Sequence, residues 1–486
     1  MSKKHRIAIA ASSFLLMAAL MSLGFAQMRN ITTQQLVRDM GLGVNLGNTF
    51  ESSGGNTTNF ETQWGSPRIT REIIAVYPKA GFKTVRVPVR WTNLMTGNTS
   101  GGTYTINPAM LDRVEEVVGW ILDEGMYVIL NIHHEDWIRN ENAGMARDSA
   151  ETMRKYLRIW EQVAERFKGY GDKLMFEGLN EEGVWNHVWY VWDSATQNNM
   201  TLKARAYGFL RTLNQGFVNL VRASGGNNDR RHLLVSGYDV NIDRTIDSYF
   251  QMPNDPAGRL AVSIHYYDPF CFTHGRPTDN WDWCGGVTTQ WGSQAERNSL
   301  NNDMNRLKTN FVDKDIPVIV GEYGVAWEGR IIPQDRVREY TLAVAEAIYS
   351  RGMLPVLWDT QLNPNNGEPI YYFNRRTPAY PDQQLVAGFL NIAGANTLSV
   401  SGGKTARAQI AAERPHITVN GRTLNVSTSA NTDLKVRMID VTGRVRATFN
   451  AVDGNGKFAV GRMPAGRYLV DVRGAGISKT TAVVLK

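Results

Sequence analysis

The sequence predicts an α/β fold in which a (β/α)8 barrel is followed by a small all-β sandwich. Three observations favour this fold. Eight short apolar runs recur between residues 40 and 360, and the segments between them are long enough for helices. This alternation stops after residue 395, where short strand-like runs and turn signals begin. The positive charge is concentrated in the same final region. Strands that alternate with helices favour a parallel sheet, and eight of them favour a closed barrel.

The first 26 residues have the pattern of a secretory signal peptide. A basic start at residues 3–6 is followed by a largely apolar stretch, and small residues stand at Gly24 and Ala26. This order predicts cleavage after Ala26. A single membrane anchor is the alternative for this stretch, and no other stretch is apolar enough to cross a bilayer. We therefore expect an extracellular bacterial protein, either secreted or held at the cell surface.

The barrel strands are predicted from apolar runs that end in polar residues. A doubly wound open sheet is the alternative, but it needs fewer strands and usually a Gly-rich phosphate loop, which the sequence lacks. Between the runs, "MLDRVEEVVGWILDEG" places Val114, Val117, Val118 and Ile121 with Leu111 on one helical face, and Gly125 is a plausible stop. The runs are "GLGVNLGN" from Gly41, "TVRVPVRW" from Thr84, "YVILNIHH" from Tyr127, "LMFEGLNE" from Leu174, "LLVSGYD" from Leu233, "AVSIHYYD" from Ala261, "PVIVGEYG" from Pro317 and "LPVLWDT" from Leu354.

The carboxyl ends of these strands carry groups that ionise, form hydrogen bonds or stack. Active sites of (β/α)8 barrels lie at this end of the sheet. Ordinary strand ends would carry mostly turn-forming residues, so the set predicts a functional site. Its members are Asn48, Arg86, His133, His134, Asn180, Glu181, His265, Tyr267, Glu322 and Trp358.

Two of these groups are carboxylates on different strands, Glu181 on the fourth and Glu322 on the seventh. Across a barrel mouth they would face one substrate from two sides. Cleavage of a glycosidic bond needs such a pair, with one acid for the leaving oxygen and one nucleophile or base. Arg86 and Tyr267 are candidates to keep Glu322 ionised, and the Asn180 amide is a candidate to hold a sugar hydroxyl.

Other interpretations of these residues remain open at this stage. Each Glu taken alone is more typical of a solvated turn, and Arg86 would serve equally to neutralise a buried carboxylate. The pair His133–His134 resembles the start of a metal site. Neighbouring strand residues point to opposite faces, however, and no metal-ligand spacing follows, so we expect no metal and no cofactor. Trp358 fits either a sugar platform or the core.

Three further tryptophans follow the fourth strand at near-helical spacing. Trp185, Trp189 and Trp192 fit either outer sugar platforms or helix packing. The spacing favours neither interpretation.

From about residue 31 to residue 395 the chain resembles glycoside hydrolase family 5, most closely its endoglucanase subfamily 4. The motifs that carry the resemblance are "GVNLGNTFE", "ETQWGSP", "AGFKTVRVPVRW", "NIHHEDW", "FEGLNE", "SIHYYDPF", "VIVGEYG" and "VLWDTQ", in family order. The resemblance implies a retaining mechanism with Glu181 as acid/base and Glu322 as nucleophile. It also implies supporting or sugar-binding positions at Arg86, His133, His134, Asn180, His265, Tyr267, Trp358, Asn48 and Glu51.

The chain departs from the family pattern directly after the acid/base. The family usually has Pro there, whereas this chain has Glu182. If Glu182 is not turned to solvent, its charge would raise the proton affinity of Glu181 by repulsion. Alternatively, the missing Pro only loosens the loop.

The resemblance implies an endo-β-1,4-glucanase that acts on cellulose or mixed-linkage glucan. Xyloglucan, xylan and mannan remain possible substrates of the same chemistry, because family membership fixes mechanism better than substrate. The contrasting class is an inactive carbohydrate-binding barrel. A polysaccharide partner and a monomeric state are expected.

Two cysteines, Cys271 and Cys284, lie in the loop "PFCFTHGRPTDNWDWCGG" after the sixth strand. An exported protein meets oxidising conditions, which permit a structural disulfide between them. Two unpaired thiols are the alternative.

The charge is divided unevenly along the chain. From Asn396 onward there are 14 Lys and Arg against 5 Asp and Glu, whereas the barrel region carries a net charge of −5. An acidic body with a basic tail predicts two modules and argues against a nucleic-acid groove in the barrel. We expect a signal at residues 1–26, a catalytic barrel at 27–395, a linker at 396–411 and a basic β-sandwich at 412–486.

The tail alternates apolar and polar residues and has turn signals at Asn420-Gly421, Thr442-Gly443 and Asp453-Gly454, as antiparallel strands do. Its "IDVTGRV…GRMPAGRYLVDV" arrangement resembles C-terminal sorting or surface-attachment domains of secreted bacterial enzymes. This implies a secretion or cell-surface partner. A carbohydrate-binding module is the alternative.

Overall fold

The structure is a computed structural model that describes most of the chain from residue 28 to residue 485. The described residues are 28–139, 144–183, 185, 199–275, 279–326, 332–360, 372–396, 416–420, 422–427, 433–440, 445–452, 455–461, 463–474 and 477–485. The proposed signal peptide and most of the proposed linker lie outside these ranges. Contacts divide the chain into two units between Ala393 and Gly394.

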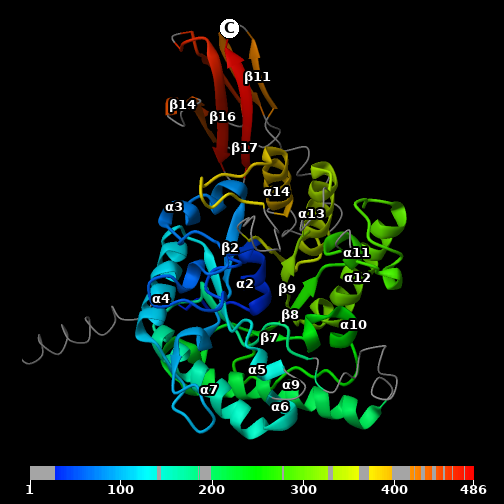
Figure 1. Ribbon diagram of the computed structural model, residues 1–486. Helices are drawn as coiled ribbons and strands as arrows, with labels where there is room; N and C mark the ends of the chain where they lie inside the picture. Colours follow the sequence, from blue (N-terminus) through cyan, green and yellow to red (C-terminus); the bar gives the residue numbers. More distant parts are fainter. Residues whose placement is uncertain are drawn as a thin grey trace, which may run out of the picture. The chain divides into compact units, whose positions relative to one another are not determined.

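The first unit contains a closed parallel barrel of eight strands, as the sequence predicts (Figure 1). Each strand pairs with the next along the chain, and the first and last strands pair with each other to close the barrel. In chain order the strands are β1 (Leu42–Asn45), β2 (Phe82–Val87), β5 (Tyr127–Asn131), β6 (Leu174–Glu177), β7 (Leu233–Ser236), β8 (Leu260–Tyr266), β9 (Val318–Tyr323) and β10 (Leu354–Leu357).

Helices surround the barrel, because each connection between parallel strands must cross from one end of the sheet to the other. A small hairpin, β3 (Met95–Thr96) with β4 (Thr105–Ile106), lies in one connection. The α-helices that follow are α3 (Arg71–Ile74), α4 (Pro108–Asp123), α5 (Asp136–Arg139), α6 (Gly144–Arg147), α7 (Ser149–Phe167), α9 (Met200–Ala223), α10 (Ile242–Thr245), α11 (Phe270–Thr273), α12 (Gln294–Asn310), α13 (Gln334–Tyr349) and α14 (Gln383–Asn396). Short 3-10 helices lie at Phe60–Thr62, Tyr77–Ala80, Trp91–Leu94, Gly226–Asp229, Tyr238–Val240, Asp282–Cys284 and Val312–Lys314.

Helix α4 shows how local sequence sets these elements. Asn107 caps its start by accepting a hydrogen bond from the Ala109 amide, and Pro108 suits the first turn. The helix ends before Gly125, whose φ of 77° favours glycine. The predicted buried face is confirmed except at Leu111, which is only partly buried while Met110 takes the core position.

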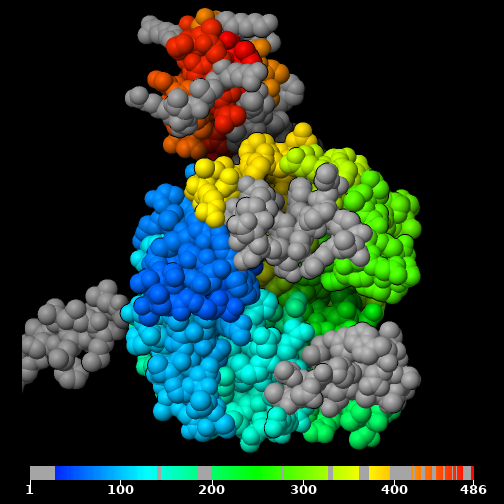
Figure 2. Space-filling model, viewed as in Figure 1, coloured from blue at the N-terminus to red at the C-terminus, as the bar shows by residue number. Residues whose placement is uncertain are grey.

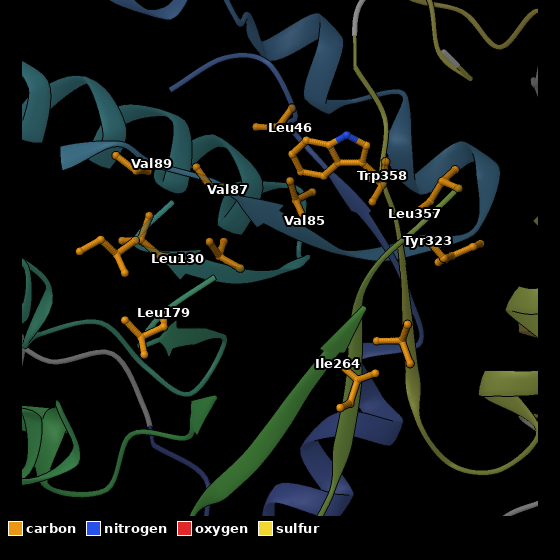
Figure 3. Close-up of a cluster of buried hydrophobic side chains, with 14 of the residues drawn as sticks. Leu46, Val85, Val87, Val89, Leu130, Leu179, Ile264, Tyr323, Leu357 and Trp358 are labelled. Atoms are coloured by element: carbon orange, nitrogen blue, oxygen red, sulfur yellow. The ribbon is translucent and has the colours of Figure 1, made fainter. Parts of the chain in front are cut away.

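The barrel has two apolar layers, because successive strand residues face opposite sides. The outward layer packs under the helices, and Figure 3 labels part of it, including Val85 and Val87 of β2 and Leu130 of β5. The inward layer is smaller. It groups strand residues with one face of α2 (Thr33–Met40) and consists of Leu36, Val37, Met40, Tyr127, Ile129, Met175, Leu234, Ala261, Ile319, Leu354 and Val356.

The apolar inward layer leaves the carboxyl ends of the strands free for polar groups. Helix α2 precedes β1 and therefore lies at the amino ends of the strands, where Thr32 starts it with a capping box to Gln35. The two sequence ends of the barrel adjoin on the surface, blue beside yellow in Figure 2, and the rings of Phe82 and Phe389 lie 5.0 Å apart. Because α2 packs on the inward layer at the amino end, the polar groups that follow the strands lie at the opposite, carboxyl end.

From His416 onward the described residues of the second unit form antiparallel β-sheets, which confirms the predicted β-class of the tail. One sheet has the order β11-β12-β15 and the other β14-β13-β16-β17. The predicted turn signals at Thr442-Gly443 and Asp453-Gly454 both lie outside the described residues. The strands are β11 (His416–Asn420), β12 (Thr423–Ser427), β13 (Leu434–Asp440), β14 (Val445–Ala451), β15 (Asn455–Ala459), β16 (Gly466–Gly474) and β17 (Ile477–Leu485).

Among the described residues, the helices are all too short or too polar to cross a bilayer.

Candidate active site

The two predicted carboxylates lie close together at the carboxyl ends of the strands. Glu322 is part of β9, and Glu181 follows the end of β6 by four residues. His265 of β8 stands with them. One nitrogen of His265 and one oxygen of each carboxylate all lie within 4.8 Å of one another. These residues lie about 60 to 140 positions apart in sequence, and the closed barrel brings them together.

The carboxylate of Glu322 is held on both oxygens. Arg86 donates from Nη1 to Oε1 at 2.8 Å, and the Tyr267 hydroxyl donates to Oε2 at 2.9 Å. The residue is only 5% exposed. Burial raises the pKa of Glu322, while the charges of His265 and Arg86 and the Tyr267 hydrogen bond oppose that rise. Both donors stabilise the ionised form and fix the orientation of the carboxylate, as a nucleophile requires.

Glu181 is more open, with a side chain 35% exposed, and it contacts His265. Oε1 of Glu181 lies 2.9 Å from Nδ1 of His265, and a carboxylate can only accept, so Nδ1 is the donor. Burial acts to raise the pKa of Glu181, but this hydrogen bond and the charge of His265 outweigh burial and lower it to about 2. The contact with His265 therefore favours the ionised form of Glu181.

Arg86 connects the site to the interior of the barrel. Its guanidinium is fully buried and forms an ion pair with Glu177 at 2.6 Å as well as with Glu322. It also donates to the side-chain oxygens of Asn45, at 3.1 Å, and Asn180, at 2.9 Å. Because Oδ1 of Asn180 is engaged by Arg86, its Nδ2 group is the one that can donate to a substrate hydroxyl.

Glu177 is a site-supporting residue that the sequence analysis did not identify. Its second oxygen accepts from Ser263 at 2.8 Å, so both oxygens are bound inside the barrel. The signal was present in the alternation of β6. Glu177 has the parity of Met175, which faces inward, and a charged residue at an inward strand position needs a buried partner such as Arg86.

Replacing Arg86 by Met is expected to lower the free energy of unfolding by about 3–5 kcal/mol, because two buried carboxylates lose their counter-charge. Urea unfolding followed by tryptophan fluorescence measures the loss. Adding Glu177→Gln to Arg86→Met should recover part of the stability, since one stranded charge is removed. A loss below about 1 kcal/mol would show that the pair contributes little, as exposed pairs do.

The predicted histidines lie beyond the strand. β5 ends at Asn131, and His134 has a positive φ of 51°, so the alternation argument applied to the two rings was wrong. The rings of His133 and His134 lie 4.4 Å apart instead of on opposite faces. Burial lowers the pKa of both imidazoles, with the neighbouring charge of His134 adding to the effect at His133. His133 is held neutral, with Nε2 4.0 Å from Oε1 of Glu322.

Trp358 follows β10 and lies in the core, and the predicted role as a sugar platform stays a prediction. It is 5% exposed and belongs to the core cluster, yet its ring stacks on His133 at 5.6 Å with planes only 6° apart. Figure 3 shows its indole ring beside Leu46 and Val85. The ring therefore forms one wall beside the site's histidines.

Asn48 and Glu51 lie in the loop after β1 and play different parts. Asn48 has a positive φ of 57° and is partly exposed. Glu51 is fully buried and accepts the backbone N–H groups of Asn48 and Thr49, so it presents no surface to a sugar. Burial raises the pKa of Glu51 to about 7, against these hydrogen bonds. Its structural part is to hold the conformation that displays Asn48.

Glu182 is buried, at 2% exposure, and its Oε2 accepts the Asn180 amide at 2.7 Å. Its backbone oxygen accepts from the Asp239 amide at 2.8 Å. Burial raises the pKa of Glu182 to about 8, and the charge of Glu181 adds to the rise. A carboxyl that is neutral near pH 7 exerts little repulsion on Glu181. The loop that has Glu182 in place of the usual Pro is therefore held by hydrogen bonds to the Glu182 side chain and backbone.

The buried Glu182 makes stability depend on pH. Its pKa is about 8 in the folded protein, whereas a glutamate in the unfolded chain titrates near 4.3. Between these values the folded state keeps a proton that the unfolded state has released. The free energy of unfolding therefore falls as pH rises through this window. We expect Tm to decrease from about pH 5 to about pH 8, and Glu182→Gln to flatten that decrease.

Thermal unfolding across the pH range measures this effect. Glu161→Gln is the matched control, because the Glu161 side chain is 60% exposed. Burial raises the pKa of Asp359 to about 6 and that of Glu51 to about 7, so part of the decrease should remain in Glu182→Gln. An unchanged slope in that variant would mean that Glu182 is ionised in the folded protein.

The remaining predicted residues serve structure in different ways. A disulfide joins Cys271 and Cys284, with Cα atoms 6.0 Å apart. Trp185 is fully buried and donates to the backbone oxygen of Ile138, so it packs instead of forming a platform. Trp189 and Trp192 lie outside the described residues.

Among the described residues, one group of side chains has the spacing to hold a metal ion, and it consists of Glu181, His265 and Glu322. Each already has a partner: Arg86 and Tyr267 bind Glu322, and Glu181 and His265 bind each other. The arrangement fits proton transfer between these groups.

Cleavage of a glycosidic bond requires two carboxyl groups that face the same reacting carbon, and Glu322 and Glu181 are placed in this way at the mouth of a (β/α)8 barrel. Fold and site thus define a glycoside hydrolase. Residues 47–364 match the model of the cellulase family, glycosyl hydrolase family 5. The chain belongs to glycoside hydrolase family 5 and, within it, to the endoglucanases of subfamily 4.

Individual relatives agree with this assignment. Endoglucanase A of Ruminococcus albus is 36% identical over 72% of this chain and 90% of its own length. A solved broad-specificity subfamily 4 endoglucanase from an uncultured bovine rumen ciliate is 35% identical, with a TM-score of 0.65, over 75% of this chain and 99% of that one. A family 5 lichenase from Caldicellulosiruptor sp. F32, solved as a mutant with cellotetraose, is 30% identical, with a TM-score of 0.66, over 76% and 97%.

Proposed function

We propose that this endo-β-1,4-glucanase cleaves internal bonds of cellulose or mixed-linkage glucan by a retaining double displacement. The observation that carries the mechanism is the spacing of Glu181 and Glu322, whose nearest oxygens lie within 4.8 Å. Retaining enzymes hold their carboxyl groups about 5–5.5 Å apart, whereas inverting enzymes leave about 6.5–9.5 Å for a water molecule.

In the first step Glu322 attacks the anomeric carbon while Glu181 gives a proton to the departing glycosidic oxygen. The C–O bond to the leaving glucan breaks as the bond to Oε of Glu322 forms. Arg86 and Tyr267 orient the attacking carboxylate through their hydrogen bonds. His265 orients the Glu181 carboxyl through the 2.9 Å contact.

In the second step Glu181, now ionised, takes a proton from water as the water attacks the anomeric carbon. The ester to Glu322 breaks, and the sugar leaves with its original configuration. The hydrogen bond from His265 stabilises the ionised form of Glu181, which is the form that accepts this proton.

The configuration of the first product tests the mechanism directly. Proton NMR of a cello-oligosaccharide digest should show the β-anomer before mutarotation. Early accumulation of the α-anomer would mean inversion and would require a water molecule between the carboxylates.

The choice of unbranched β-glucan rests on the relatives, which include endoglucanases and a lichenase, three of them solved with cello-oligosaccharides. Reducing-sugar release should be highest on carboxymethyl-cellulose and lichenan, compared with xyloglucan, xylan and glucomannan. A relative named as xyloglucan-specific, from Bacteroides ovatus, is 31% identical. Xyloglucan is therefore the main alternative substrate, and higher activity on it than on lichenan would replace the proposed substrate. No reducing-sugar release from any of the five polysaccharides would favour the inactive carbohydrate-binding barrel.

We further propose export to the cell surface or medium, with the C-terminal unit as a sorting or attachment domain. The basic and apolar start of the chain and the excess of Lys and Arg in the tail support this. Deleting residues 412–486 in a secreting bacterial host should leave the enzyme active but mislocalised. Normal secretion with lost retention on insoluble glucan would instead favour a carbohydrate-binding module.

A further inference from the structure

The loop after β8 carries a cluster of aromatic rings that the catalytic steps do not use. We call Phe270, His274, Trp281 and Trp283 the aromatic cluster. His274 and Trp281 stack on Phe270, with centroids 4.4 and 5.3 Å away and planes within 10° and 22°. Trp283 completes the group at 5.9 Å from Trp281 and 6.2 Å from Phe270. Phe270 is 36% exposed and Trp283 is 69% exposed.

The described residues on both sides of the loop that carries these rings are joined to each other and to the segment after β9. The Cys271–Cys284 disulfide closes it, and the backbone oxygen of Trp281 accepts from the amides of Cys284 and Gly286 at 3.3 and 3.0 Å. The oxygen of Thr273 accepts from the Ala326 amide after β9. The exposed Trp283 thus stands next to the disulfide and these hydrogen bonds, and a large exposed apolar side chain at such a place indicates a binding surface.

The aromatic cluster is continuous with the catalytic centre. Tyr267, which donates to Glu322, packs its ring edge-on against His274 at 4.6 Å. His274 then stacks on Phe270, and Phe270 leads to the exposed Trp283. A row of rings therefore runs outward from the nucleophile along the carboxyl end of β8.

The geometry points to a further glucose subsite on the aromatic cluster, with Trp283 as its exposed platform for a β-1,4-glucan chain. This rests on the proposed function. The faces of glucose rings in such a chain carry C–H groups that pack on indole, and their hydroxyls remain free for water or polar neighbours. Asp282, between the two tryptophans, is exposed and able to accept a hydroxyl.

The subsite is assigned to the leaving-group half of the substrate. Glu181 protonates the leaving oxygen in the proposed mechanism, and its carboxylate contacts His265 of β8, the strand whose end continues into this loop. The histidines and Trp358 form the other wall, at the ends of β5 and β10. A chain crossing the mouth from that wall toward β8 reaches the aromatic cluster after the cleaved bond.

Substrate length provides the test. Wild type and Trp283→Ala are compared on cellohexaose and on an aryl cellobioside, whose leaving group is a single ring too short to reach Trp283. We expect kcat/KM on cellohexaose to fall about tenfold in Trp283→Ala, and kcat/KM on the aryl cellobioside to change less than twofold. Trp283→Phe, which keeps a stacking face, should recover part of the loss.

Two further variants sharpen the comparison. Leu390→Ala truncates another exposed apolar residue, 46% exposed and packed against Gly81 at the amino end of β2, and should behave as wild type on both substrates. Replacing Cys271 and Cys284 together by Ser should give a smaller loss on cellohexaose alone, because the loop is released but the rings remain.

Equal kcat/KM on cellohexaose for wild type and Trp283→Ala would overturn the subsite, as would a parallel loss on both substrates. A changed sedimentation coefficient with unchanged kinetics would also overturn it, since the patch would then join copies of the chain. If wild type cleaves neither substrate, the proposed function itself fails. The failure of the subsite is therefore distinguishable from that of the enzyme.

Discussion

Glu322→Gln will abolish hydrolysis of β-glucan, with kcat lowered by at least about 10⁴-fold, because an amide does not attack the anomeric carbon. The loss should be in kcat, while binding of cello-oligosaccharides measured by calorimetry persists. The substitution is nearly isosteric: the amide oxygen can still accept from Arg86, and the Tyr267 hydroxyl, which now faces the amide nitrogen, can accept from it. Circular dichroism and Tm show whether the barrel is intact.

A chemical rescue separates the nucleophile from other roles. Glu322→Ala with added azide should form a glycosyl azide of inverted configuration, because azide occupies the space of the missing carboxylate and attacks in its place. Activity of Glu322→Gln within about tenfold of wild type would contradict the assignment of the nucleophile.

Glu181→Gln is expected to lower kcat on glucan by about 10²–10⁴-fold, the usual contribution of general acid–base catalysis. The loss should depend on the leaving group. A dinitrophenyl cellobioside departs without a proton, so its first step should stay near the wild-type rate. The second step still needs a base, and a burst of dinitrophenol followed by slow turnover is expected.

The neighbouring carboxyl supplies a matched control for this prediction. Glu182→Gln changes a buried group one residue away that contacts the Asn180 amide and not the substrate. It should show no burst with the dinitrophenyl substrate. An equal loss of kcat in Glu181→Gln on glucan and on dinitrophenyl cellobioside would mean that Glu181 acts by shaping the site and not by transferring a proton.

The eight strands were predictable because each combines an apolar run with a polar end, and all eight are confirmed. The exact residues at which the strands end were harder to predict from the sequence. The run "YVILNIHH" gives no sign of where the strand ends. In the structure its pairing with β2 stops at Leu130 and its pairing with β6 stops at Asn131. The orientation of His133 and His134 therefore follows loop geometry, to which a two-residue period does not apply.

Residues whose role depends on burial were hardest to infer. Glu51 and Glu182 stand in polar segments, and both are inside because backbone amides from their own loops satisfy them. Trp185 has the spacing of either a platform or a packed helix, and only its contacts with Phe209 and Tyr238 decide for packing. Glu177 could have been found from strand parity and the need of Arg86 for a second partner.

The hydrogen bonds of Arg86 have a consequence for when the enzyme becomes active. One guanidinium binds groups delivered by β1, β6, the segment after β6, and β9, which are Asn45, Glu177, Asn180 and Glu322. These strands meet only when the sheet has closed and each is in register. A partly folded chain therefore lacks an oriented nucleophile, so catalytic activity serves as a readout of completed barrel assembly.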